Sequence, residues 1–470
     1  MPRGTYARMV PAAASPALDT TTTARDLRAV LAARGFRRLI GVRLISQVAD
    51  GWFQAALAGS VLFNPEKRTS PMQIAIGFAV LLLPYSLIGP YVGVFLDRWS
   101  RRSIIVVANL LRALLVLPTI ALIWFGLENA LFVALAFLII GLNRFFLAGL
   151  SAAIPHVVAD RRLVTANALS GTLGSICFSL GLGSAVILVK TALSVTLHGY
   201  ALLAALAPIG YVASALLARW SFRPAELGPD VRERRSGTIG AAMVEVARGM
   251  VAGVRHLSDR RGAAYAVLAQ SAFRTLYGVL ALAVLLLYRQ YFHHDKDLSG
   301  SIGGLGMVFV AGGAGVLIAA FLTPPVTRRI GGWRWITWML AGTAVVVVVF
   351  GLPFNPTLLV VAVLFVNIAT QSIKIVVDTA LQHECADAYR GRVFSINDTA
   401  FNVCFVVGLF IAALSLPADG HSPATLVLVG LGYALVTVWY AAAGGRWARR
   451  VGDDIAGLPL RRAGIERASS

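Results

Sequence analysis

Long apolar runs, each about as long as a membrane is thick, follow one another along most of this chain. A helix needs about 20 apolar residues to cross the hydrocarbon core of a bilayer. Runs of this length, separated mostly by short polar connections, predict twelve transmembrane helices. Their expected ranges are 39–64, 71–96, 103–125, 130–155, 164–189, 197–218, 263–288, 300–325, 335–353, 357–382, 393–415 and 423–444. The expected fold is therefore an all-α membrane protein with two six-helix bundles.

One long polar interval separates the two groups of six runs. Residues 219–262 contain nine Arg and no Lys, and apolar residues recur there every three or four positions. This spacing predicts an amphipathic helix that lies on the membrane surface. The apolar positions are Ile239, Met243, Val246, Met250, Val254 and Leu257. We expect five segments: an N-terminal tail (1–35), a first bundle (36–218), a basic linker (219–262), a second bundle (263–446) and a C-terminal tail (447–470).

Composition excludes an ordinary soluble protein. Hydrophobic residues make up 57% of the chain and charged residues only 14%, with a mean hydropathy of +0.75. The net charge of +20 does not require a nucleic-acid partner, because most Lys and Arg residues fall on one side of the predicted topology. Only Lys67, Arg68, Lys190, Arg289 and Lys296 fall in connections on the other side. By the positive-inside rule, both termini and the linker are expected in the cytoplasm.

Metal, cofactor and enzyme motifs are missing from the sequence. It contains no G-x-x-x-x-G-K-[ST] phosphate loop and no H-E-x-x-H group, and its three cysteines are scattered, as free thiols are. The pairs His293–His294 and Asp295 with Asp297 could bind a metal loosely, although a solvated loop is the simpler interpretation. We expect no cofactor and no enzyme; a membrane-embedded enzyme is kept as an alternative that needs a clustered catalytic set.

Polar stripes run along the faces of predicted transmembrane helices. In the first helix polar residues lie at 43, 47, 50 and 54, and in the tenth at 367, 371, 374 and 378, with identical spacings of four, three and four. Each stripe occupies one helix face. Because intramembrane charge is costly, these faces are expected to point away from lipid and to carry function. The candidate cavity residues are Asp50, Gln54, Asn143, Arg144, Gln270, Arg274, Gln371, Lys374 and Asp378.

Among these, Asp50 is the expected proton-titrating carboxylate, because it lies near the centre of its helix, where desolvation favours the protonated acid. Arg144 is its expected partner. Four residues separate Lys374 from Asp378, a spacing that allows them to pair along one helix. For both pairs, a fixed structural ion pair is the alternative.

Other basic residues of the spans have a structural interpretation. Arg43 and Arg112 are placed shallowly enough to extend their side chains to the membrane surface. The spans nevertheless hold more basic than acidic residues, and this excess favours an anionic or zwitterionic substrate.

A short charged turn connects the second and third predicted helices. Its sequence, G-V-F-L-D-R-W-S-R-R at 93–102, resembles motif A of the major facilitator superfamily of transporters, with Ser100 in place of the second glycine. The glycine allows close helix approach, the aspartate can pair with a base, and the arginines hold the turn at the cytoplasmic surface. We expect a gating motif formed by Gly93, Asp97, Arg98, Arg101 and Arg102.

The two halves also resemble each other. An H-x-x-A-D pentad begins at His156, at the end of the fourth helix, and again at His383, at the end of the tenth. The second copy of motif A has lost its acidic residue, and Pro324 stands where its glycine belongs. Duplicated halves are a feature of the same superfamily, in which the first and fourth helix of each half line a central cavity.

A finer resemblance involves three short segments. They are A-D-G-W at 49–52, T-A-N-A-L at 165–169 and Y-R-G-R-V-F-S at 389–395, and they look like the subgroup that contains the enterobactin exporter and macrolide-efflux proteins. The resemblance covers residues 36–446. It implies export of an amphiphilic small molecule, such as a drug, a siderophore or a lipid-like metabolite. Because the sequence has no ATP-binding motif, we expect alternating access coupled to a proton gradient or another ion gradient, in a plasma-membrane protein whose default state is a monomer.

Two departures from the family pattern, the decayed second copy of motif A and a missing proline in the fifth helix, keep other interpretations open. No proline occurs between Leu163 and Ala207, so the kinked fifth helix of the family's antiporters is not expected. Uptake of an anionic or zwitterionic solute is the main alternative, and a receptor or scaffold that has lost transport is another.

Overall fold

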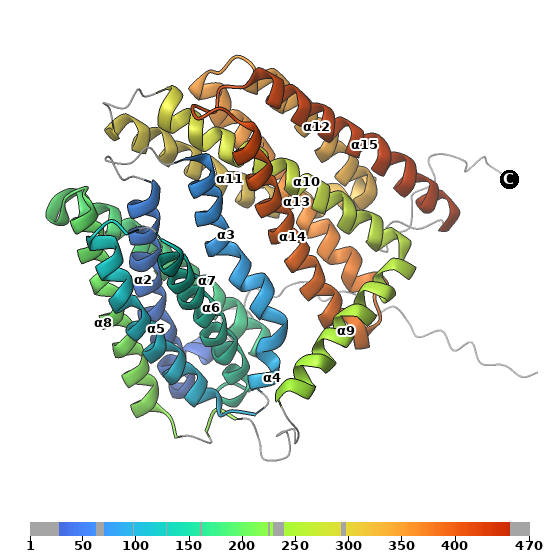
Figure 1. Cartoon of the computed structure of the whole chain (residues 1–470). Coiled ribbons are helices and arrows are strands. Elements are labelled where there is room, and N and C mark those ends of the chain that lie inside the picture. Colours follow the sequence, from blue (N-terminus) through green and yellow to red (C-terminus); the bar gives the residue numbers. More distant parts are fainter. Residues whose placement is uncertain are drawn as a thin grey trace, which may run out of the picture.

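In the computed structural model, two groups of long helices stand side by side (Figure 1). The structure describes residues 28–62, 70–96, 98–127, 129–159, 162–223, 226–228, 239–292 and 298–451. No strand occurs in this part of the chain. The all-α membrane fold expected from the sequence is therefore confirmed.

The first group contains six long helical segments in the predicted order. They are α2 (Arg34–Leu62), α3 (Pro71–Ile88) with its continuation through η1 (Gly89–Tyr91) and α4 (Val92–Leu96), α5 (Arg101–Trp124), α6 (Ala130–Ala153), α7 (Leu163–Leu188) and α8 (Leu197–Ser221). Two short segments follow α6 and α7: the 3-10 turn η2 (Ile154–His156) and the π-helical turn η4 (Val189–Leu193).

The second group begins after a separate helix, α9 (Ile239–Asp259), which coincides with the amphipathic helix predicted in the linker. Its six long helices are α10 (Arg261–Leu286), continued by the π-helical turn η5 (Leu287–Tyr291), α11 (Leu298–Ile330), α12 (Gly332–Gly351), α13 (Pro356–Glu384), α14 (Asp387–Ser415) and α15 (Pro423–Val451).

Among the described residues, eleven helices are long and apolar enough to cross a membrane. One further long helix, α2, is long enough but does not reach the apolar content of the other eleven. Its polar stripe, which includes Arg43, Gln47, Asp50 and Gln54, lowers its apolar content although it packs within the first bundle. A helix can carry such a stripe inside a membrane only when the stripe faces protein or water.

Side chains at the starts of several helices explain where they begin. Ser70 and Gln73 form a reciprocal capping box at α3, and Asn129, Thr196 and Asn355 accept backbone N–H bonds at α6, α8 and α13. Such caps satisfy N–H groups that have no partner in the first helical turn. The sequence therefore fixes these helix starts locally.

Two glycine pairs allow helices to cross at close range, at equivalent places in the two bundles. In the first bundle Gly51 of α2 faces Gly181 of α7, and in the second Gly278 of α10 faces Gly408 of α14. A Cβ on either member of a pair would overlap backbone atoms of the opposite helix. These are the first and fifth helices of each half, so the crossings support the internal repeat.

The outer surfaces of both bundles expose large apolar side chains, as a membrane protein requires. Examples are Leu114, Ile209, Phe321 and Leu435, each more than half exposed. Between the bundles, α3 packs against α6 on one side and α14 on the other, and α9 lies across the end of α14 (Figure 1). The face between α3 and α14 is where the two halves meet.

Candidate functional site

A central cavity of about 930 Å³ lies between the two bundles. The first bundle contributes the polar side chains of Gln47, Gln54, Asn143 and Arg144, and the second contributes Arg274, Asp398, Thr399 and Asn402. Apolar and aromatic residues from both halves form much of the remaining wall: Phe78, Leu81, Leu82, Phe178, Tyr277, Phe394 and Phe405. A few polar groups on an otherwise apolar wall are typical of a small-molecule site.

Arg274 is held in this wall by aromatic rings. Its guanidinium carbon lies 3.9 Å from the ring centre of Phe401, 4.4 Å from that of Phe405 and 5.1 Å from that of Tyr277. Its Nε donates a hydrogen bond to the Phe401 carbonyl at 3.1 Å. Cation–π contact stabilises a desolvated guanidinium. The arginine is therefore fixed in place with its charge at the cavity.

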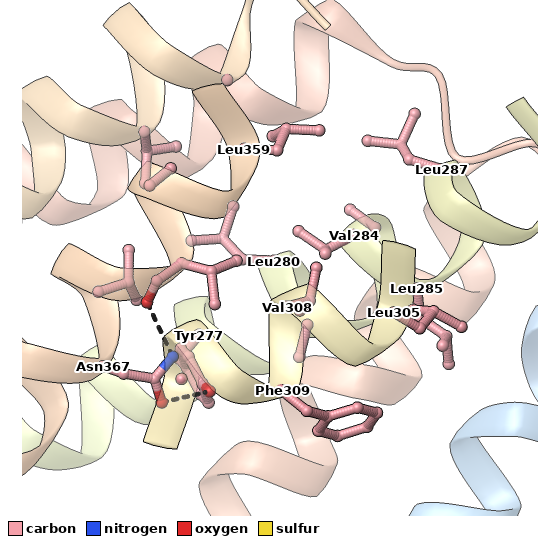
Figure 2. Close-up of a pocket in the computed structure, with 18 of the residues that line it drawn as sticks. Tyr277, Leu280, Val284, Leu285, Leu287, Leu305, Val308, Phe309, Leu359 and Asn367 are labelled. Carbon is pink, nitrogen blue, oxygen red and sulfur yellow. Dashed lines mark hydrogen bonds between the residues drawn. The ribbon is translucent and has the colours of Figure 1, made fainter. Parts of the chain in front are cut away.

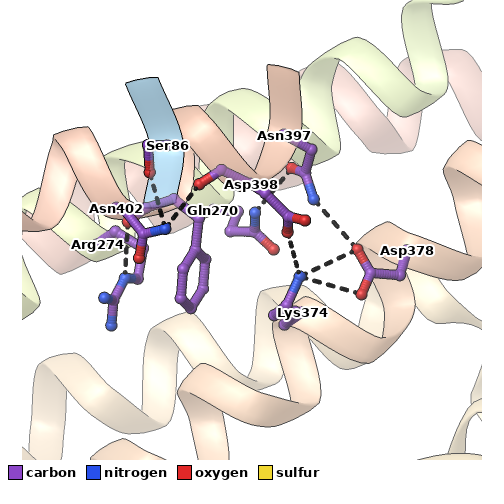
Figure 3. A network of polar contacts seen from close by, with 9 residues as sticks. Ser86, Gln270, Arg274, Lys374, Asp378, Asn397, Asp398 and Asn402 are labelled. Atoms are coloured by element: carbon purple, nitrogen blue, oxygen red, sulfur yellow. Dashed lines mark hydrogen bonds and ion pairs between the residues drawn. The ribbon is translucent and has the colours of Figure 1, made fainter. Parts of the chain in front are cut away.

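A network of charged and amide side chains joins α10, α13 and α14 (Figure 3). Lys374 Nζ lies 3.2 Å from Asp378 Oδ2 and 3.0 Å from Asp398 Oδ1. Asn397 donates to Asp378 at 3.1 Å and accepts from Gln270 at 2.9 Å. Lys374, Asp378 and Asp398 form what we call the charged trio. With one ammonium and two carboxylates, it has a net charge of −1 when all three are ionised.

The most accessible member of the charged trio is Asp398. Its side chain is 59% exposed, against 29% for Asp378 and 25% for Lys374. Because Asp398 also lines the central cavity, it is the carboxylate through which that cavity reaches the trio.

Hydrogen bonds between the bundles lie next to the charged trio. Thr399 donates to the Ser86 carbonyl at 3.2 Å. Asn402 donates to the Ser86 hydroxyl at 3.0 Å and to the Asp398 carbonyl at 3.1 Å (Figure 3). Ser86 belongs to α3 and its partners to α14. A change in charge at Asp398 would therefore act one residue from a contact that holds the halves together.

A second ion pair lies inside the first bundle, away from the cavity lining. Arg112 of α5 contacts Asp50 of α2, and both side chains are at most 3% exposed. Tyr211 of α8 donates to Asp50 at 3.0 Å, and its ring centre lies 3.9 Å from the Arg112 guanidinium carbon. Arg112 also donates to Ser46 at 3.2 Å and to Asn109 at 3.1 Å. These bonds join three helices of one bundle.

Two sequence-based expectations are therefore wrong. Asp50 pairs with Arg112 instead of Arg144, and Arg112 does not extend to the membrane surface, because it is completely enclosed by α2, α5, α6 and α8. Hydrophobic spacing placed Arg112 on its own helix but could not show which helices pack around it. Arg43, the other arginine of that expectation, is half-buried and donates to Ser170 at 2.7 Å.

Of the nine cavity candidates, Gln54, Asn143, Arg144 and Arg274 line the central cavity. Gln270, Lys374 and Asp378 belong to the adjoining network, and Asp50 belongs to the buried pair. Gln371 is half-buried and makes no side-chain hydrogen bond to any described residue. The nine residues thus divide among different places instead of surrounding a single cavity.

The sequence analysis did not identify a set of four cavity-lining residues that share one face of α14. They lie at 391, 395, 398 and 402 and include Asp398 and Asn402. Their spacing of four, three and four is the same as that of the stripes in α2 and α13. This pattern was present in the sequence and would have placed a polar face on the eleventh predicted helix.

The gating-motif residues have different surroundings. Arg98 lines a pocket formed with α9 and α14, whereas Arg101 contacts His156 and donates to the Leu227 carbonyl at 3.3 Å. Arg102 donates to the Arg219 carbonyl at 2.8 Å, at the end of α8. Arg98 is thus directed towards the second bundle, and the other two arginines bind within the first.

Ser100, which replaces a glycine of the motif, caps α5 by accepting from the Ser103 N–H at 3.2 Å. Gly93 lies in α4, and Asp97 lies outside the described residues. The loosely metal-binding set at 293–297 is also outside them, and no group of three potential metal ligands occurs in the described part of the chain.

Comparison with known proteins identifies relatives of this chain. Residues 39–409 match the family model of the Major Facilitator Superfamily. An uncharacterized MFS-type transporter of Mycobacterium tuberculosis is 36% identical over 403 residues, which cover 86% of this chain and 89% of the relative. A Mycobacterium bovis protein of the same description matches equally well.

Two solved structures illustrate the likeness in fold. The peptide transporter POT, as a point mutant, aligns with a TM-score of 0.62 and 13% identity, covering 89% of this chain and 95% of its own. The nucleoside transporter NupG aligns with a TM-score of 0.58 and 11% identity, covering 87% and 99%. At these identities the likeness concerns the fold alone.

Proposed function

We propose that this chain, which belongs to the Major Facilitator Superfamily and is a multi-pass secondary transporter, exports an amphiphilic small molecule in exchange for protons. The central cavity carries this proposal, because it combines aromatic and aliphatic walls with two arginines and one aspartate. Such a lining suits a molecule that has both an apolar and a polar part. Drugs, siderophores and lipid-like metabolites all have this character.

Export is supported by the resemblance of residues 49–52, 165–169 and 389–395 to the enterobactin exporter and macrolide-efflux proteins. The distribution of Lys and Arg supports a plasma-membrane protein with both termini in the cytoplasm. The two halves of one chain form the cavity, so a monomer is sufficient for the proposed activity.

Proton coupling is assigned to Asp398, with Lys374 and Asp378. Asp398 is exposed to the cavity, whereas Asp50, the carboxylate favoured by sequence alone, is enclosed with Arg112. Protonation of Asp398 would remove one negative charge beside Lys374 and weaken its ion pair. Because Asn402 joins the Asp398 carbonyl to Ser86, we place the coupling between proton binding and bundle movement at this point.

Alternating access then requires the contact between α3 and α14 to open and close. Arg98 lines the pocket where α4, α9 and α14 meet, so it is placed to respond to that movement. Arg101 and Arg102 hold their turn against the end of the first bundle. In this arrangement the motif gates the cytoplasmic side of the cavity.

Uptake is the second candidate function, and one observation favours it. The cavity wall carries two arginines against one aspartate, a balance that attracts anionic or zwitterionic solutes. The two directions predict opposite effects on cells, so a single assay separates them.

The assay compares the susceptibility of cells with and without this chain to a panel of toxic anionic, neutral and cationic amphiphiles. Export predicts protection against some of the compounds and loss of that protection when a protonophore collapses the proton gradient. Uptake predicts greater sensitivity instead. An unchanged panel in cells shown to insert the protein would contradict both.

Proton coupling is tested in proteoliposomes with a transported compound and an imposed pH gradient. We expect Asp398→Asn to abolish gradient-driven accumulation. Asp419→Asn is the matched control, because Asp419 lies in an exposed turn before α15 and, among the described residues, its side chain accepts a hydrogen bond from the backbone N–H of His421 alone. Coupled flux in Asp398→Asn equal to that of the unchanged protein would remove Asp398 from the mechanism.

A further inference from the structure

A second pocket, of about 400 Å³, lies inside the C-terminal bundle (Figure 2). Helices α10, α11, α12, α13 and α15 supply most of its wall, and Leu280, Val284, Val308 and Leu359 surround it in Figure 2. None of the described residues that line it is charged. The polar members are Tyr277, whose hydroxyl donates to Asn367 at 3.2 Å, and Asn367, which donates to its own helix at 2.9 Å. The amide is thus occupied within the protein, and the pocket suits a purely apolar group.

Three aromatic residues separate this side pocket from the central cavity. Phe78, Tyr277 and Phe405 line both spaces. The rings of Phe78 and Phe405 pack edge to face with their centres 6.3 Å apart, and the ring centres of Tyr277 and Phe405 lie 5.5 Å apart. The two spaces therefore share one wall, made of these three aromatic side chains.

We infer that the substrate is a single-chain anionic amphiphile, with its acidic head in the central cavity and its alkyl chain in the side pocket. This assignment rests on the proposed transport function and deepens it. An alkyl chain passing between the three rings would connect the two spaces. A charged head is not expected to follow it, because the described lining of the side pocket holds no charged group with which to pair.

The head is assigned to the arginine side of the cavity. Arg274 uses Nε for its hydrogen bond to Phe401, and no described residue receives a hydrogen bond from its two terminal nitrogens. A guanidinium presents these two donors in the geometry of a carboxylate or a phosphate. Arg144 lies on the opposite bundle at the same cavity, so both halves can contact the head.

Two observations assign the alkyl chain to the side pocket: the wall that this pocket shares with the central cavity, and the exposed outer face of α11 beside the pocket. On α11 the lining residues Phe309, Gly313 and Val316 are also exposed on the outer face of the bundle. In a membrane this face meets lipid tails. An amphiphile that is dissolved in the bilayer would therefore have its chain close to the pocket before the head enters the cavity.

The test measures binding of butyryl-, octanoyl- and lauroylglycine to the full chain in nanodiscs, with partition into empty nanodiscs subtracted. Affinity should increase with chain length, by up to about fourfold per methylene buried. Gly313→Leu should remove most of this increase, because Gly313 lines the pocket and a Cβ there meets no other residue within 4 Å, which leaves room for the added side chain. For the lauroyl compound we expect a loss of affinity of at least about tenfold.

Gly306→Leu is the matched control on the same helix. A Cβ at Gly306 also meets nothing within 4 Å, but this residue does not line the pocket, so wild-type binding is expected. Val284→Phe, on α10, fills the pocket from the opposite side and gives a second variant if Gly313→Leu does not fold. Arg274→Gln should weaken all three ligands by a similar factor.

The outcomes separate this inference from the proposed transport. The side-pocket assignment would be overturned if affinity did not depend on chain length. It would also be overturned if folded Gly313→Leu and Val284→Phe both kept the wild-type increase of affinity with chain length, even if other compounds are transported. Chain-dependent binding that these variants abolish would support it even if no gradient-driven flux occurs, and the transport proposal would then fail alone.

Discussion

The buried ion pair of Asp50 and Arg112 is surrounded by side chains that form hydrogen bonds and a cation–π contact with it. The guanidinium has two neutral hydrogen-bond acceptors and a tyrosine ring as neighbours, and the carboxylate accepts from Tyr211. Removal of one partner from a buried pair leaves an uncompensated charge. The pair therefore constrains how α2, α5 and α8 pack together.

We predict that Asp50→Asn lowers the free energy of unfolding by about 3–5 kcal/mol. The measurement is an unfolding titration in detergent. The double variant Asp50→Asn with Arg112→Met should recover part of the loss, because it also removes the unpaired cation. A double variant less stable than Asp50→Asn would show that Arg112 is stabilised mainly by its other contacts.

The sequence placed both residues in membrane spans but could not identify them as partners. Sixty-two positions separate Asp50 from Arg112, and their contact depends on how α2 and α5 are rotated about their axes. Periodicity gives the face of a helix that is polar. It does not give the neighbour that this face meets.

At the scale of the helices, close crossings at glycine pairs define the geometry of each bundle. The crossing of α10 and α14 at Gly278 and Gly408 also positions the wall between the two pockets, because Tyr277 and Phe405 lie beside these glycines on the same helices. A larger residue at the crossing would push the helices apart and move both aromatic rings.

We predict that Gly408→Ala lowers the free energy of unfolding by about 1–3 kcal/mol or more, because its Cβ would overlap the Thr275 carbonyl of α10. Gly306→Ala should cause no loss, since the same substitution there meets open space. Apparent melting temperatures in one detergent compare the two. Equal temperatures for both variants would show that the crossing can relax.

Helix positions were largely predictable from the chain. The first span was expected at 39–64 and α2 is Arg34–Leu62; the tenth was expected at 357–382 and α13 is Pro356–Glu384. Apolar length sets these limits, and local caps such as Asn355 fix the starts. The interruption of the second span at η1 also has a local cause, because Pro90 has no backbone N–H to donate.

At the scale of the whole molecule, the two bundles meet along α3 and α14. The described hydrogen bonds across this face converge on Ser86, from Thr399 and Asn402. The proposed alternating access requires these bonds to break and form again in each cycle, so a covalent link at this point should stop transport.

We predict that Ser86→Cys with Asn402→Cys, in a background without the three native cysteines, loses transport on oxidation and recovers it on reduction. The control is Thr323→Cys with Ser372→Cys, a hydrogen-bonded pair 2.9 Å apart between α11 and α13 of the same bundle. A link there should leave flux unchanged. Full transport by the oxidised Ser86–Asn402 pair, once the link is verified by mass, would contradict movement at this face.

By itself the sequence determined that this is a membrane protein of long helices, with a basic linker between two groups of six and with polar faces on particular helices. These properties follow from the length and period of apolar runs, which are local quantities. Only the tertiary structure decided that Asp50 meets Arg112, that Lys374 meets Asp398, and that three aromatic rings divide a polar cavity from an apolar pocket. Such contacts depend on how helices distant in sequence are rotated and cross one another. The packing of all the helices together sets these rotations and crossings.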